Sequence, residues 1–88
     1  MNDDILTAPA RRIREARFKL GLSQEKVAIA VGVYQPTVTI WESKTRYTRP
    51  QDVFIDGLAR TLGLDVQQLF ILYALADLER ARRRQASQ

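Results

Sequence analysis

Cysteine and histidine are both absent from this 88-residue sequence. Without cysteine there are no disulfides, thiolate metal ligands or thiol nucleophiles, and without histidine the other common zinc ligand and the commonest general base are missing. Long apolar runs are lacking too, because the longest, residues 69–76, is far shorter than the roughly 20 residues that a membrane span requires. We therefore expect no enzyme, no metal site, no cofactor and no membrane segment.

The length suits one small domain and leaves no room for a second. Fourteen Lys and Arg residues against ten Asp and Glu residues give a net charge of +4. The basic residues gather near the start (Arg11 to Lys19), in the middle (Lys44 to Arg49) and at the end (Arg80 to Arg84). A polyanion partner such as DNA would explain such clusters, although any single cluster is explained as well by a solvated helix face. The N-terminal residues show no secretory signal pattern, so a cytoplasmic protein is expected.

Apolar residues recur at helical spacing along the chain, and no segment alternates as a strand does. The sequence therefore predicts an all-α fold of five helices, preceded by a flexible tail over residues 1–8. The expected helices cover residues 9–20, 24–31, 35–43 and 50–62, with a last helix capped by Asp65 that reaches about Arg84.

The stretch from Ser23 to Lys44 predicts two short helices joined by a tight turn. Its apolar residues keep helical spacing on both sides of Gly32, and glycine tolerates the positive φ that such a turn requires. The Ser23 hydroxyl can cap the first helix, and Glu25 suits the positive end of that helix's dipole.

Five pieces of sequence follow one another in a fixed order over residues 13–70: IREAR, LGLSQEKVAIAVGV, QPTVTIWESK, a proline after a basic loop, and LARTLGLDVQQLF. In these pieces the chain resembles the Cro- and cI-repressor-like helix-turn-helix proteins, also called the XRE family. The resemblance implies a compact, five-helix, lambda-repressor-like domain over residues 9–70 that binds double-stranded DNA. Residues 71–88 then extend the last helix and end in a basic tail. The resemblance also implies a transcriptional regulator of bacterial, phage or plasmid origin.

The outer face of the second motif helix is the predicted base-reading surface. A glutamine amide can pair with adenine, and threonine can offer a hydroxyl or a methyl group to thymine. Ile40 either contacts a thymine methyl group or turns inward, and both alternatives stay open. The predicted base-reading residues are Gln35, Pro36, Thr37, Thr39 and Ile40.

Phosphate contacts are implied by the resemblance. In the proteins that this chain resembles, the glutamine that opens the first motif helix and the basic loop after the recognition helix hold the phosphates. Tyr34 stands where the family usually has a small capping residue, and we expect it to touch the DNA backbone or to change the helix start. The predicted phosphate-binding residues are Gln24, Tyr34, Lys44, Arg46 and Arg49.

The resemblance also implies an ion pair between Arg17 in the first helix and Glu42 at the end of the recognition helix. Arg17 lies on the apolar face of its helix, where an unpaired charge would be costly. We therefore interpret this pair as structural.

The last helix carries two apolar stripes, one of Leu69, Leu72, Tyr73 and Ala76, the other of Ile71, Leu75 and Leu78. A core of this size cannot bury both, so one face is expected to meet a second protomer, although the helix can also fold back over its own domain. A two-fold dimer would place two recognition helices on a pseudo-palindromic operator. The predicted dimerisation residues are Leu72, Tyr73, Leu75, Ala76 and Leu78.

Together these observations favour a small dimeric repressor that binds double-stranded DNA. One alternative is the antitoxin of a toxin-antitoxin pair, in which the same fold binds its operator and the last helix or the tail binds a toxin. The other is a protein-interaction module that has lost DNA binding, an alternative that the apolar residues Phe18 and Ile40 keep open.

Overall fold

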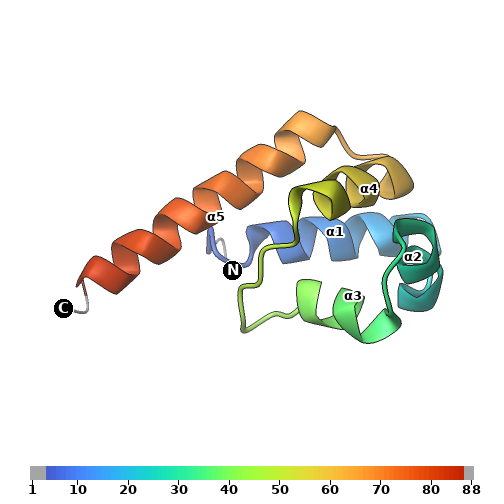
Figure 1. The fold of residues 1–88 in the computed structure, drawn as a ribbon, viewed down its shortest axis with the longest axis horizontal. Helices are drawn as coiled ribbons and strands as arrows, with labels where there is room; N and C mark the ends of the chain where they lie inside the picture. The colour runs from blue at the N-terminus through green and yellow to red at the C-terminus, as the bar shows by residue number, and fades with distance from the viewer. Residues whose placement is uncertain (1–3, 87–88) are drawn as a thin grey trace.

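The computed structural model describes residues 4–86. This part of the chain forms five helices joined by loops and contains no strand. They are α1 (Ala8–Lys19), α2 (Gln24–Val31), α3 (Gln35–Trp41), α4 (Asp52–Leu62) and α5 (Val66–Ala86). Figure 1 shows α1 in the middle of the domain, with α3 on one side of it and α4 and α5 on the other. The C-terminal part of α5 reaches past the other helices (Figure 1). The predicted all-α fold of five helices is confirmed.

Local sequence signals determine the two ends of α2. At its start, Ser23 Oγ accepts a hydrogen bond from the Lys26 backbone N–H at 3.1 Å. At its end, Gly32 adopts a φ of 91°, which residues with a side chain rarely adopt. The Gly32 and Val33 N–H groups then both donate to the Ala28 carbonyl, at 2.8 and 2.9 Å. These contacts satisfy backbone groups that the helix itself leaves unpaired and direct the chain toward α3.

Two predicted helix boundaries are wrong by two residues. The recognition helix ends at Trp41 rather than at residue 43, because the chain turns where Ser43 Oγ accepts from the Thr45 and Arg46 N–H groups, at 3.3 and 3.1 Å. The fourth helix begins at Asp52, so that Pro50 lies in the preceding loop instead of in the first turn. Pro50 is buried there.

The predicted tail contains an ordered turn ahead of α1. Asp4 accepts two backbone hydrogen bonds, from Thr7 N–H to its carbonyl at 3.1 Å and from Leu6 N–H to its Oδ1 at 3.0 Å. Its carboxylate also pairs with Arg83 of α5 at 2.7 Å. The prediction for residues 1–3 lies outside the described residues, whereas residues 4–7 are held to the domain by these contacts.

All five helices contribute apolar side chains to one core. Its buried members are Ile13, Ala16, Val27, Ala28, Val38, Trp41, Ile55, Leu58, Ala59, Leu62, Leu69 and Tyr73. At Gly57 in α4, an added Cβ would lie 3.5 Å from Val31 Cγ1, an ordinary van der Waals distance, so α4 and α2 are in contact here. Trp41 packs against Phe54 with ring centroids 5.7 Å apart, which joins the end of α3 to α4. The short helix α3 is thereby held on the core from behind, with its other face outward.

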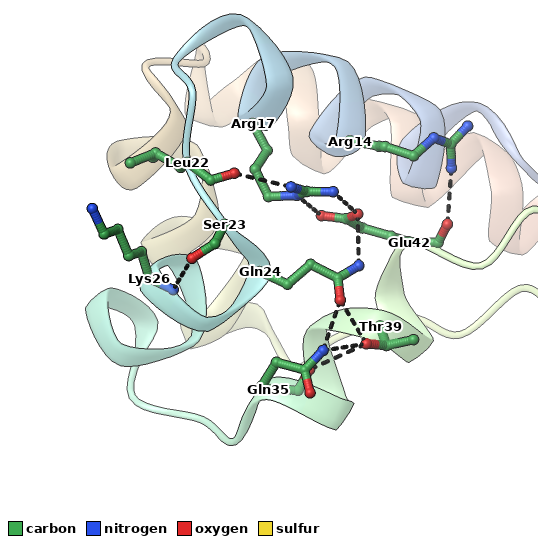
Figure 2. Close-up of polar contacts among 9 residues, drawn as sticks. All are labelled: Arg14, Arg17, Leu22, Ser23, Gln24, Lys26, Gln35, Thr39 and Glu42. Carbon is green, nitrogen blue, oxygen red and sulfur yellow. Dashed lines mark hydrogen bonds and ion pairs between the residues drawn. The ribbon is translucent and has the colours of Figure 1, made fainter.

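A buried ion pair joins α1 to the end of α3. Arg17 Nε and Nη2 donate to the two Glu42 carboxylate oxygens at 2.7 and 2.9 Å, and both residues are buried (Figure 2). Arg17 Nη1 also donates to the Leu22 carbonyl at 2.9 Å, and Arg14 donates to the Glu42 carbonyl at 2.8 Å. The hydrogen bond to Glu42 raises the pKa of Arg17, so its positive charge is permanent. The structure thus brings together the two residues that the sequence analysis paired.

Replacing Glu42 with alanine should leave the Arg17 charge buried and without its carboxylate. Loss of one partner of a buried pair costs about 3 kcal/mol or more, because desolvation of the other charge is no longer compensated. Urea unfolding followed by circular dichroism should therefore show a large fall in the free energy of unfolding. Glu25→Ala is the matched control, since Glu25 is exposed and its loss should cost less than about 1 kcal/mol. Equal stabilities of the two variants would contradict a structural role for the pair.

Candidate nucleic-acid interface

The recognition helix α3 begins directly after Tyr34. Tyr34 has extended backbone angles and makes no side-chain capping bond, and its side chain is 85% exposed. The first turn is closed by the Thr37 N–H, which donates to the Tyr34 carbonyl at 2.9 Å. Pro36 lies in this turn, where its missing N–H has no partner to lose. The helix therefore starts at Gln35 as predicted, without the small capping residue usual in the proteins that the chain resembles.

The outward face of α3 carries most of the predicted base-reading residues. Val38 and Trp41 point into the core, and Thr37 is partly buried beside them. The exposed members of the predicted set are Gln35, Pro36, Thr39 and Ile40.

Gln24, the first residue of α2, links this face to the buried ion pair. Its Nε2 donates to Glu42 Oε1 at 3.1 Å, and its Oε1 accepts from Gln35 Nε2 and from Thr39 Oγ1, both at 2.8 Å (Figure 2). Gln35 Nε2 also donates to Thr39 Oγ1 at 2.9 Å. One continuous network therefore runs from Arg17 in α1 to the two polar side chains on the surface of α3.

The carboxylate of Glu42 determines which way the Gln24 amide points. An ionised carboxylate only accepts hydrogen bonds, so it must face the NH2 end of the amide. The Gln24 carbonyl oxygen is then directed at Gln35 and Thr39. Sequence reasoning assigned Gln24 to phosphate alone, whereas the structure also makes it the support of the predicted reading face. The i, i+4 spacing of Gln35 and Thr39 signals their contact in the sequence, but nothing there signals their contact with Gln24.

Ile40 lies beside a shallow groove between α3 and the loop that follows. The groove has a volume of about 480 Å³ and is lined by Thr39, Ile40, Ser43, Arg46 and Thr48. Ile40 is 50% exposed, so of the two alternatives the structure shows the outward orientation. An apolar surface at this position can meet a thymine methyl group.

The three predicted basic residues of the loop divide into two groups. The side chains of Lys44 and Arg46 are exposed next to α3. Arg49 instead bridges two carboxylates, with Nη1 3.0 Å from Asp77 Oδ2 and Nη2 2.6 Å from Asp52 Oδ1. The Asp52 hydrogen bond and the nearby Asp77 charge raise the pKa of Arg49. A phosphate would have to compete with both carboxylates for Arg49, so Lys44 and Arg46 are the better placed pair.

On α5, burial corrects part of the predicted dimer surface. Tyr73 and Ala76 are buried in the domain's own core, because their stripe of the helix packs on α1 and α4, so a second protomer cannot reach them. Leu72 of the same stripe is partly buried against that core. Leu75 and Leu78 remain exposed, together with Ile71 of the second stripe. One stripe therefore folds back on the domain, and the other faces outward and stays a predicted dimerisation surface.

The basic end of α5 is partly neutralised within the chain. Arg82 and Arg83 both pair with Glu79, at 2.6 and 2.7 Å, and their hydrogen bonds lower the pKa of that carboxyl to about 2. Arg83 also pairs with Asp4 of the N-terminal turn. The predicted basic tail is thus a set of ion pairs over much of its described length, and residues 87 and 88 lie outside the described residues.

Other classes of site find little support in residues 4–86. No group of three or more acidic side chains lies close enough to hold a metal ion in this part of the chain. Within the same range, no helix is long and apolar enough to cross a membrane. The polar face of α3 and the basic loop beside it are the best candidate site.

Known proteins provide an independent comparison. A curated protein of Methanothermobacter thermautotrophicus, named an uncharacterized HTH-type transcriptional regulator, is 43% identical to this chain over 61 residues. The match covers 68% of this chain and 86% of that relative. No protein-family model matches the chain, and no solved structure gives a significant match. With this identity over most of the relative, and with the helix-turn-helix geometry of α2 and α3, the chain belongs to the helix-turn-helix transcriptional regulators, which are DNA-binding proteins.

Proposed function

We propose that the protein binds a specific double-stranded DNA site as a dimeric transcriptional repressor of the Cro and cI type. The observation that carries this proposal is the network from Arg17 to the surface of α3, which holds Gln35 and Thr39 in place before any DNA arrives. Preorganised polar groups on an outward helix are what direct readout of base edges in the major groove requires.

Base reading falls to the N-terminal part of α3. The amide of Gln35 suits adenine N7 and N6, and the Thr39 hydroxyl beside it suits either a base edge or a phosphate. Pro36 and Ile40 add apolar surface on each side, and Thr37 contributes its exposed portion. Because Gln24 holds both Gln35 and Thr39, substitutions of Gln24 should also disturb sequence preference.

Phosphate binding falls to residues that flank the reading face. Lys44 and Arg46 are exposed in the loop after α3, and Tyr34 is exposed before it. Gln24 lies at the N-terminus of α2, where backbone N–H groups and the helix dipole favour an anion. Contacts on both sides of α3 would fix the register of the helix in the groove.

Dimerisation falls to the exposed stripe of α5. Ile71, Leu75 and Leu78 follow one another at spacings of four and three residues and leave an apolar strip facing outward. A strip on a helix that projects past the domain can pack against the same strip of a second copy around a two-fold axis. Two recognition helices would then face successive turns of a pseudo-palindromic operator.

A protein-interaction role without DNA binding is the main rival, and the exposure of Phe18 and Ile40 favours it. The Arg17 guanidinium lies over the Phe18 ring, 4.5 Å from its centroid, but Phe18 is still 64% exposed. An antitoxin role differs from the repressor role only by a second protein bound to α5, so co-purification of such a partner would identify it.

Salt dependence of DNA binding tests the proposed function. DNA fragments selected from a random pool should be bound more tightly than random fragments, and log Kd should rise linearly with the logarithm of the salt concentration. Two phosphate contacts per protomer, from Lys44 and Arg46, predict a slope of about 3.6 for a dimer, at about 0.9 per contact. Weak binding to every fragment, with a flat salt response, would favour the protein-interaction module.

Two substitutions should separate base reading from phosphate binding. Gln35→Ala should weaken binding to the selected site by about 1–3 kcal/mol and leave binding to random DNA nearly unchanged. Lys44→Ala should weaken both by a similar factor and lower the salt slope, because phosphates carry no sequence information. Fluorescence anisotropy titrations on both DNAs measure these effects. A neutral Gln35→Ala would show that the reading face is misassigned.

Leu78→Glu should dissociate the proposed dimer. The new charge would lie within the apolar strip of α5, where desolvation without a partner is costly, while the monomer fold is undisturbed because Leu78 is exposed. Val53→Glu is the matched control, since Val53 is equally apolar and exposed but lies on α4. Sedimentation equilibrium should give the monomer mass for the first variant and the dimer mass for the second. A dimer that survives Leu78→Glu would place the interface elsewhere.

A further inference from the structure

Tyr47, in the loop between α3 and α4, is held by one face of α5. Its ring lies 6.4 Å from the ring of Tyr73, between centroids, and the Arg80 guanidinium carbon lies 5.2 Å from its centroid. Its hydroxyl donates to Asp77 Oδ1 at 2.7 Å and lies 3.3 Å from the Tyr73 carbonyl oxygen. Tyr73, Asp77 and Arg80 are spaced i, i+4 and i+7, so they form a single seat for this side chain on α5.

Asp77 binds a second residue of the same loop. While Oδ1 accepts from Tyr47, Oδ2 pairs with Arg49 at 3.0 Å. Arg49 continues to Asp52 in the first turn of α4. One partly buried carboxylate on α5 therefore anchors two loop residues whose positions differ by two.

Both ends of the basic segment are restrained. On the α3 side, Ser43 Oγ accepts the N–H groups of Thr45 and Arg46. On the α4 side, Tyr47 and Arg49 are bound to Asp77, and Pro50 is buried. Lys44 and Arg46 project from the short segment between these anchors, so their reach toward DNA depends on both.

We propose that Asp77 and Tyr47 form a clamp that positions the loop carrying Lys44 and Arg46, so that α5 helps to determine where these two residues meet the DNA backbone. The clamp residues touch no DNA themselves and act through the loop. This inference rests on the proposed function, because it assigns the loop to phosphate binding. It adds a role for α5 in DNA binding that is separate from its apolar strip.

The Tyr47 hydroxyl is suited to be a permanent donor in this clamp. Burial raises its pKa, and the hydrogen bond to the Asp77 carboxylate raises it further. The phenol therefore stays protonated at every pH at which DNA binding is measured. It can be removed without a change of charge by Tyr47→Phe.

The chain provides a matched control for that substitution. The hydroxyl of Tyr73 is buried and has no hydrogen-bond partner among the described residues, so Tyr73→Phe removes the same atom from the same contact region without breaking a bond. Amide hydrogen exchange in the free protein should become about 10-fold faster over residues 44–48 in Tyr47→Phe and stay unchanged in Tyr73→Phe. Exchange rates that are equal in the two variants would overturn the clamp, whatever the DNA measurements show.

DNA titrations then test whether the clamp matters for binding. Tyr47→Phe should raise Kd about 3- to 10-fold on the selected site and on random DNA alike, with a lower salt slope and an unchanged ratio between the two DNAs. A variant that had only lost fold stability, measured below its melting temperature, would keep the wild-type salt slope of DNA binding. Faster loop exchange with wild-type affinity, or a loss confined to the selected site, would overturn the positioning role.

A second pair of variants covers the carboxylate. Asp77→Ala and Asp52→Ala each remove one negative charge from Arg49, but only the first also releases Tyr47. Simple electrostatics predicts tighter DNA binding for both. The clamp predicts that Asp77→Ala binds several-fold more weakly than Asp52→Ala, and equal affinities would count against it.

Wild-type protein that fails to bind DNA would instead overturn the proposed function. Amide hydrogen exchange of the loop would still test the clamp separately.

Discussion

The buried ion pair between Arg17 and Glu42 is the interaction on which the arrangement of the helix-turn-helix depends. Two charges removed from water must be satisfied almost completely, and here the carboxylate is met by the guanidinium and by the amide of Gln24. This requirement brings the end of α3 against α1 and orients Gln24. The orientation of Gln24 in turn places a carbonyl oxygen before Gln35 and Thr39. The buried ion pair thus fixes the position of side chains on the protein surface through a series of hydrogen bonds.

Recognition helix α3 could not hold its position without such support. Its seven residues are fewer than a helix needs to persist by itself in water. Val38 and Trp41 anchor it from behind, and the polar network holds it at one side. The outward side chains are therefore displayed on a surface that is rigid because of its attachments. This arrangement suits the proposed reading of base edges, because the helix is already ordered in the free protein.

The orientation of α5 about its own axis, which decides which of its faces is buried, has three consequences. With Leu69, Tyr73 and Ala76 turned into the core, Ile71, Leu75 and Leu78 must face outward. The same orientation places Asp77 and Arg80 next to the loop after α3, where they contact Tyr47 and Arg49. The helix thereby completes the core, leaves an apolar strip for the proposed partner copy and restrains the proposed phosphate-binding loop.

Local rules over a few residues predicted the approximate helix positions, the Ser23 cap, the Gly32 end of α2 and the outward face of α3. Family resemblance added the partnership of Arg17 and Glu42. Local rules could not choose between the two stripes of α5, since that choice depends on what α1 and α4 offer to pack against. Nor could they show Gln24 between Glu42 and α3, or Asp77 holding Tyr47 and Arg49. Those contacts join residues 11 to 30 positions apart. Periodic sequence patterns are local and do not predict contacts that form only when the helices pack together.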